Sequence, residues 1–102
     1  MDQAVGGGSL DAVEQALQQA LMREWKPPSI DEVPPAQRRA VVELVIWRDG
    51  SVRSAYLQKP SGSEDMDSSV RLALSRVTKI SETLPSSFPK ERYDLRVNFQ
   101  IE

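Results

Sequence analysis

The sequence predicts an α+β fold: a two-layer domain in which a three-stranded antiparallel sheet is covered by an N-terminal helix and a crossover helix, in the order α-β-β-α-β. One observation is the stretch 37–75, which reads as two strands joined by a tight turn and followed by an amphipathic helix. Another is the strict alternation of the last ten residues. With 102 residues, 39% of them apolar, the chain can build one two-layer core.

The first helix is expected to begin at Ser9, a good N-cap residue, with Asp11 and Glu14 near its positive end. Pro27-Pro28 ends it, because proline lacks the donor that a helix needs. Apolar residues recur within it at spacings of three and four: Leu10, Val13, Leu17, Ala20, Leu21 and Trp25. The glycine-rich residues 1–8 read as a flexible linker or the start of an expressed fragment, which leaves 9–102 as the folded domain.

The first strand is predicted from Arg39 to Trp47, and it is apolar on both faces apart from Glu43. A strand of this kind is expected in the centre of a sheet. Asp49-Gly50 follows it, and this dipeptide favours a type I′ hairpin turn, in which both central residues have positive φ.

The second strand, Ser51 to Gln58, places Val52 in one phase of the alternation and Ala55 and Leu57 in the other, so we expect a β-bulge between them. The crossover helix is expected to start at Ser63 or Asp65 and to reach about Ser81. Its buried stripe consists of Met66, Val70, Ala73, Leu74, Val77 and Ile80.

The closing strand buries one set of side chains and exposes the other. The buried set is Tyr93, Leu95, Val97, Phe99 and Ile101, and the exposed set is Asp94, Arg96, Asn98 and Gln100. A right-handed crossover places this strand antiparallel beside the first, which predicts the sheet order 2-1-3. One edge of the closing strand is then left open.

Composition argues against an enzyme and against nucleic-acid binding. The chain has neither histidine nor cysteine, which removes the commonest general base, metal ligand and thiolate nucleophile. Asp65 and Asp67 sit at a helix start, where they complement the helix dipole, and we predict no metal and no cofactor. The net charge of −2 and the scattered basic residues give no footprint for nucleic acid.

The open edge of the last strand is the candidate functional element, because an extended peptide can add to it through main-chain hydrogen bonds. The predicted partner-binding residues are Tyr93, Asp94, Arg96, Asn98, Gln100 and, on the face of the sheet without helices, Trp47. The alternative is an ordinary edge strand protected by its charges, with Trp47 as half-buried filler.

Several short segments, in this order and spacing, resemble the C-terminal domain of the TonB and TolA family of envelope energy transducers. They are Trp25-Lys26-Pro27-Pro28, Arg48-Asp49-Gly50-Ser51-Val52, Lys59-Pro60-Ser61-Gly62, Asp67 with Val70 and Ala73-Leu74, the Pro85 to Pro89 loop, and Val97-Asn98-Phe99-Gln100-Ile101. Pro60 stands where the family often has serine, and the Tyr-Pro pair that often opens the TonB domain is missing before the first strand. The helix ending in Trp-x-Pro-Pro is closer to the TolA-like branch.

The resemblance implies a periplasmic domain, anchored to the inner membrane in the full-length protein and non-enzymatic. It implies contact with an outer-membrane receptor or a periplasmic protein, whose peptide adds to the edge of the last strand, and with inner-membrane motor proteins through upstream segments. The same edge can capture a second copy of the domain by edge pairing or strand swapping. The alternative function is a structural or assembly domain of an envelope or secretion complex, which uses the face around Trp47 and transduces no energy.

Overall fold

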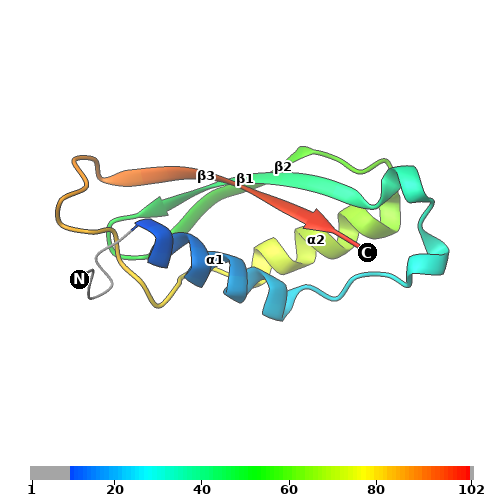
Figure 1. Ribbon diagram of the computed structural model, residues 1–102, viewed down its shortest axis with the longest axis horizontal. Coiled ribbons are helices and arrows are strands. Elements are labelled where there is room, and N and C mark those ends of the chain that lie inside the picture. Colours follow the sequence, from blue (N-terminus) through cyan, green and yellow to red (C-terminus); the bar gives the residue numbers. More distant parts are fainter. Residues whose placement is uncertain (1–9, 102) are drawn as a thin grey trace.

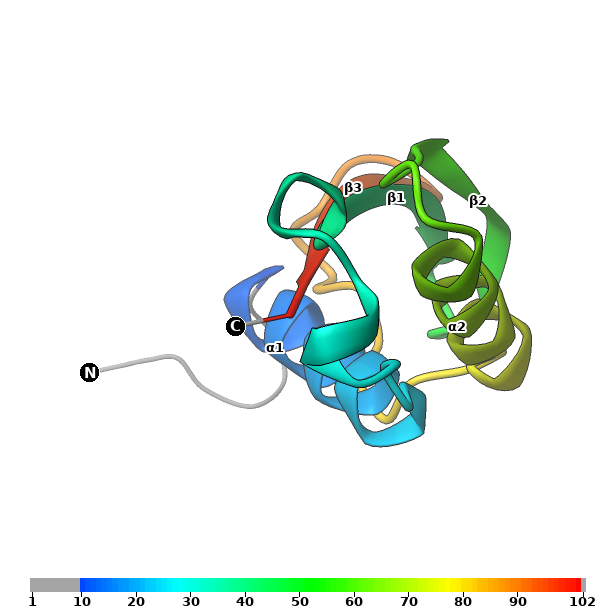
Figure 2. The same cartoon turned by 90° about the vertical axis from the view of Figure 1, so that its right-hand side faces the viewer.

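The computed structural model describes residues 10–101, which form two layers (Figure 1). The helices are α1 (Leu10–Glu24) and α2 (Glu64–Arg76), and the strands are β1 (Arg39–Trp47), β2 (Val52–Lys59) and β3 (Arg92–Gln100). Two short 3-10 turns, Ile30–Glu32 and Pro35–Gln37, lie between α1 and β1. Both helices cover the same face of the sheet, α1 beneath β3 and α2 beneath β2 (Figure 2). The predicted fold class is confirmed.

The sheet order β2-β1-β3 is also as predicted, and both strand pairs are antiparallel. The central strand β1 buries Ala40, Val42, Leu44 and Ile46 completely against the helices. Its opposite face carries the half-buried Val41, Val45 and Trp47. The central position of β1, with a flanking strand on each side, agrees with its apolar residues on both faces.

The core consists of the apolar stripes of the three strands and both helices. Its largest fully buried side chain is Phe99, whose ring meets that of Trp25 edge-on at a centroid distance of 5.1 Å. The Trp25 indole N–H in turn donates to the Ser69 hydroxyl on α2, at 2.9 Å. Through Trp25, the residue directly after α1, this aromatic pair joins the end of α1 to β3, and the indole N–H joins it to α2.

The bulge expected in β2 is present. Glu43 pairs with Tyr56 and Val45 with Arg53, so β2 has one residue more than β1 over this stretch. Ser54, inside the bulge, has a φ of +56°. The extra residue lets Val52, Ala55 and Leu57 all pack against the core although they differ in alternation phase.

The turn between β1 and β2 is not the type I′ turn predicted from Asp49-Gly50. Only Gly50 has a positive φ (+91°) in this turn, and its N–H donates to the Trp47 carbonyl at 2.8 Å. The Trp47 N–H then donates to the Ser51 carbonyl, which makes a three-residue loop with Gly50 in the left-handed position. The Asp49 carboxylate accepts from the Ser51 N–H at 2.9 Å and stabilises this form.

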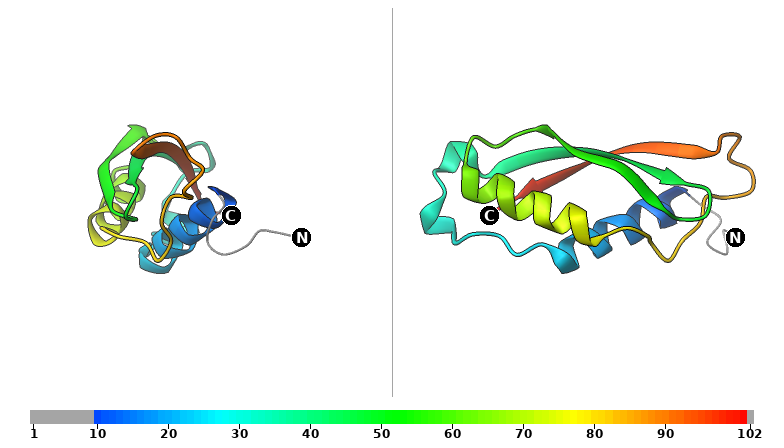
Figure 3. Two further views of the ribbon diagram at one scale, coloured as in Figure 1. Left: turned by 90° about the vertical axis from the view of Figure 1, so that its left-hand side faces the viewer. Right: turned by 180° about the vertical axis from the view of Figure 1, so that it is seen from behind.

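Helix α2 ends at Arg76, five residues before the predicted end at Ser81. The following residues run extended along the hairpin: the Val52 N–H donates to the Thr78 carbonyl at 2.9 Å, and the Ile80 N–H donates to the Gly50 carbonyl at 3.0 Å. The β-branched residues there favour extended backbone. Val77 and Ile80 remain buried, so the apolar pattern was correct and the backbone conformation was wrong. Figure 3 shows the hairpin turn and the segment after α2 meeting at one end of the molecule.

The start of α2 is capped as predicted, by the Ser63 hydroxyl, which accepts from the Met66 N–H. Asp67, which is only 6% exposed, does more than complement the helix dipole. Its carboxylate accepts from the Ser61 N–H at 2.9 Å and from the Ser61 hydroxyl at 2.8 Å. Asp67 therefore fixes the loop between β2 and α2. The predicted cap Ser9 and linker 1–8 lie outside the described residues.

Replacing Asp67 with alanine is expected to lower the free energy of unfolding by about 1 to 3 kcal/mol, because the Ser61 donors lose their acceptor. Asp67→Asn keeps an acceptor oxygen and should lose less. The matched control is Asp65→Ala, which removes an exposed carboxylate from the same helical turn. Urea unfolding measures all three, and equal losses for Asp67→Ala and Asp65→Ala would show that the loop is held by something else.

Candidate partner-binding edge of the sheet

Strand β3 has a strand neighbour on one side only. All nine of its residues pair with β1 in an unbroken register, from Arg92 opposite Trp47 to Gln100 opposite Arg39. In the part of the chain that the structure describes, no strand lies on its other side. The result is an open edge with a regular register.

The hydrogen bonds at the two ends of the β1–β3 ladder show which backbone groups face this edge. The Ile101 N–H donates to the Arg38 carbonyl at 3.0 Å, and the Arg48 N–H donates to the Glu91 carbonyl at 2.9 Å. Hydrogen-bonded pairs alternate with non-bonded pairs along an antiparallel ladder, so the odd-numbered residues of β3 bond to β1. The N–H and C=O groups that point to the open edge are those of Arg92, Asp94, Arg96, Asn98 and Gln100.

The other edge of the sheet, formed by β2, is a poorer template for an added strand. Its first outward N–H, that of Val52, is already bonded to Thr78, and Ser51 forms an isolated bridge with Lys79. Its pairing with β1 also shifts register twice. Bulges and covering segments are the usual means of blocking an edge. The free edge of β3 is therefore the longer and more regular of the two.

The side chains of these outward residues lie on the face of the sheet away from the helices, where two of them form polar contacts with residues of β1. Arg96 forms an ion pair with Glu43 at 3.6 Å, and Arg39 donates a long hydrogen bond to Asn98 at 3.5 Å. Tyr56 also donates its hydroxyl hydrogen to Glu43. Arg96 and Asn98 are thus fixed by the outer face, while their backbone groups stay directed at the edge.

Tyr93 faces the opposite way, toward the helices. Its hydroxyl donates to the Glu14 carboxylate of α1 at 2.6 Å, and its ring meets Phe88 edge-on at 5.4 Å. The hydrogen bond to the Glu14 carboxylate raises the pKa of the Tyr93 hydroxyl to about 12. Tyr93 therefore remains a neutral donor and joins the start of β3 to the first turns of α1.

Trp47 lies on the outer face of β1, one strand away from the open edge, and is half-buried. The guanidinium of Arg53 stacks on its ring, 4.8 Å from the centroid. The structure thus divides the predicted site residues into three groups. Tyr93 lies on the helical face, the exposed residues of β3 lie on the outer face at the open edge, and Trp47 lies on the outer face of the neighbouring strand β1.

A model of the TonB C-terminal family matches residues 11–101, nearly the whole chain. The chain belongs to this family. The predicted resemblance is confirmed, whereas the preference for the TolA-like branch stays a prediction.

The fold of this TonB-family domain is shared with a solved structure, the solution NMR structure of TolAIII bound to a peptide derived from the N-terminus of TolB. The two have a TM-score of 0.67 and 19% sequence identity over 98% of this chain and 81% of that chain. No curated protein shows significant sequence similarity to the chain.

Two hollows flank the open edge of this TonB-family domain. One, of about 350 Å³, lies between α1 and the middle of β3, where α1 contributes Glu14, Leu17 and Gln18. The other, of about 440 Å³, lies at the start of β3 and is formed by Phe88, Pro89, Lys90, Arg92, Tyr93 and Asp94. Sequence reasoning missed the contribution of α1, because Glu14 and Gln18 read as ordinary solvent-exposed surface and Leu17 reads as part of the core stripe.

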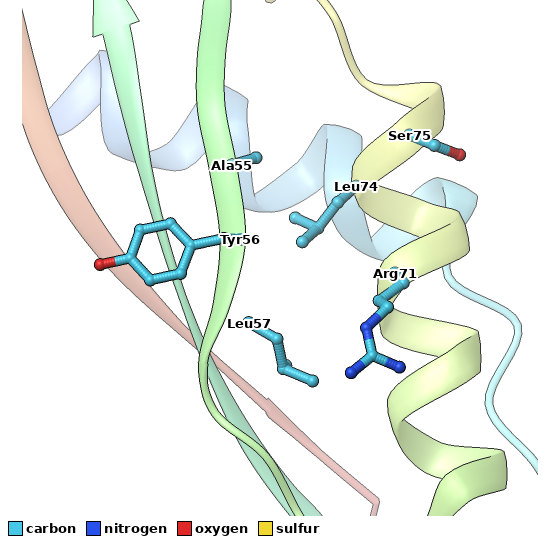
Figure 4. Close-up of a pocket in the computed structure, with 6 residues that line it drawn as sticks. All are labelled: Ala55, Tyr56, Leu57, Arg71, Leu74 and Ser75. Carbon is cyan, nitrogen blue, oxygen red and sulfur yellow. The ribbon is translucent and has the colours of Figure 1, made fainter.

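A third hollow lies on the opposite flank, between β2 and α2 (Figure 4). Leu57 and Leu74 point into it and Arg71 lies at its side, whereas Tyr56 points away, to the outer face. Its volume, about 330 Å³, is close to the 350 Å³ of the hollow between α1 and β3. It borders the interrupted edge of β2, so it lacks the regular row of backbone groups found along β3.

Among residues 10–101 no group of three or more His, Cys, Asp or Glu side chains is placed to hold a metal ion. Over the same residues, neither helix is long and apolar enough to cross a membrane.

Proposed function

We propose that this chain is a non-enzymatic protein-binding domain of a TonB/TolA-like energy transducer, which binds its partner by strand addition at the open edge of β3. The observation that carries the proposal is the unbroken row of outward backbone groups from Arg92 to Gln100. Main-chain hydrogen bonds to such a row give affinity, and neighbouring hollows for alternate side chains give selectivity.

The partner we propose is an extended peptide segment of a periplasmic protein or an outer-membrane receptor. Membership of the TonB C-terminal family supports this class of partner, and so does the similar fold of TolAIII, which was solved with a peptide derived from the N-terminus of TolB. In this proposal residues 9–102 act in the periplasm. Residues 1–8 and further upstream segments connect them to an inner-membrane anchor and to motor proteins.

Backbone amide exchange tests the mode of binding. The domain is titrated with nine-residue synthetic peptides copied from the N-termini of periplasmic proteins of the same genome. The amides of Asp94, Arg96, Asn98 and Gln100 are expected to gain protection, because they face the edge, whereas those of Leu95, Val97 and Phe99 are already bonded to β1. This alternation is specific to strand addition.

Perturbation around Trp47, with an unchanged β3 edge, would instead favour the assembly function. No observation favours that function over strand addition at present, because the Trp47 ring is already stacked with Arg53 of the same chain. Motor-protein genes beside this one would support the transducer, and secretion genes would support assembly.

The same edge is suited to pairing with a second copy of the domain, since two β3 edges placed antiparallel give a symmetric dimer. Such a dimer would occupy the backbone groups that a partner peptide needs. Sedimentation at several concentrations, with and without peptide, distinguishes the two: a peptide that binds the edge should dissociate the dimer.

A further inference from the structure

The groove between α1 and β3 indicates which side chains a bound strand carries, and this inference rests on the proposed function. A strand added beside β3 points alternate side chains to the outer face and to the helical face. Those on the helical face lie next to the inward side chains of β3, Tyr93, Leu95 and Val97, and enter the groove between β3 and α1. The chemistry of the groove therefore selects every second residue of the partner.

The middle of the groove is apolar. Leu17 of α1 is fully buried beneath it, while Leu95 and Val97 keep 9% and 8% of their surface exposed at the edge. A side chain of the partner opposite these two residues would cover this remaining apolar surface. Burial of that surface favours an aliphatic residue at each of these two positions.

The end of the groove nearest Tyr93 is acidic. The Tyr93 hydroxyl holds the Glu14 carboxylate at 2.6 Å through one oxygen, and an ionised carboxylate has further acceptor sites. Asp11, one turn before Glu14, also acts electrostatically on the Tyr93 hydroxyl. Of the charged residues that line the groove, Asp94 and Arg96 point their side chains to the outer face, where Arg96 is paired with Glu43, so Glu14 is the charge on the helical face.

We infer that the partner strand carries two aliphatic residues opposite Leu95 and Val97 and, next on the same face, a lysine or arginine opposite Tyr93. The aliphatic residues pack over Leu17, and the cation pairs with Glu14. The ligand class is thus an extended peptide with the pattern basic, aliphatic, aliphatic at every second position, read along β3 from Tyr93 to Val97.

Four synthetic peptides test this pattern. Each has threonine at every outward position, and the inward positions read Lys-Val-Val, Val-Val-Lys, Glu-Val-Val or Val-Val-Glu. The first order suits a strand parallel to β3, and the second suits an antiparallel one. At low salt, one lysine peptide is expected to bind about 1.5-fold to fivefold more tightly than its glutamate counterpart, the range for an exposed charge pair.

Glu14→Lys should reverse this preference, and 0.5 M salt should remove most of it, because exposed charges are screened. The matched control is Glu32→Lys, which makes the same change of net charge at an exposed site in the connection between α1 and β1. Thermal unfolding of each variant checks that the fold is retained. Tyr93→Phe removes the hydroxyl group that positions the Glu14 carboxylate. This variant should therefore reduce the preference for lysine without reversing it, because the negative charge remains.

The outcomes separate this inference from the proposed function. Equal affinity for lysine and glutamate peptides, with the Arg96 and Asn98 amides still gaining protection, would overturn the inference and leave strand addition standing. A preference that survives Glu14→Lys would place the selecting acid elsewhere and also overturn it. If no peptide protects these amides, the edge does not bind strands of this kind. The inferred side-chain pattern and the proposed strand addition are then both wrong.

Discussion

Replacing Gly50 with alanine is expected to lower the free energy of unfolding by about 2 to 4 kcal/mol, a large part of the stability of a domain this size. Gly50 has a φ of +91°, which costs a residue with a Cβ about 1 to 2 kcal/mol. A Cβ at this position would also lie 2.6 Å from the Glu82 carbonyl oxygen and 3.0 Å from that of Ile80. The backbone of the segment after α2 would have to move.

Gly62→Ala is the matched control for this prediction. Gly62 has a similar φ of +98°, but a Cβ there would meet only the Gln37 side chain, at 3.4 Å. It therefore carries the cost of positive φ without the backbone clash. Urea unfolding of both variants isolates the clash as the difference between them, and equal losses would show that the segment after α2 adapts freely.

Replacing Asn98 with proline is expected to weaken binding of an edge peptide at least tenfold while changing the unfolding free energy by no more than about 1 to 2 kcal/mol. The Asn98 N–H faces the open edge, so proline removes no hydrogen bond to β1. It does remove a donor to the partner and places a ring where the added strand must lie. Isothermal titration calorimetry measures the affinity, and urea unfolding measures the stability.

Two neighbouring variants are the controls. Val97→Pro removes a donor that bonds to β1, so it should destabilise the domain by several kcal/mol. Asn98→Ala removes only the side chain and its weak contact with Arg39, so its affinity should stay close to that of the unaltered domain. If Asn98→Pro binds as tightly as Asn98→Ala, the partner does not use this edge.

Hydrophobic periodicity was enough to predict the architecture. The strict alternation of β3 and the two apolar faces of β1 placed one strand at an edge and the other in the centre, and the structure confirms both. The phase change in β2 likewise predicted its bulge. These features depend on which side chains avoid water, and that information lies along each segment itself.

Local patterns failed where a distant segment determines the backbone. Asp49-Gly50 predicted a two-residue turn, and the stripe of α2 predicted five more helical residues, yet the turn and the segment after α2 bond to each other through Gly50, Val52, Thr78 and Ile80. Extended backbone at 77–80 buries Val77 and Ile80 just as a helix would and also accepts a hydrogen bond from the first open donor of β2, the Val52 N–H. Periodicity could not distinguish the two conformations.

The sequence by itself determined the α+β class, the strand order and the open edge of β3, because burial of alternate side chains constrains all three. The tertiary structure alone decided what stands beside that edge. The docking of α1 beneath β3 brings Glu14 to Tyr93, 79 positions away in the chain, and turns a plain edge into a groove with an acidic end. Such an encounter depends on how two packed elements align, and neither segment carries a local signal for it.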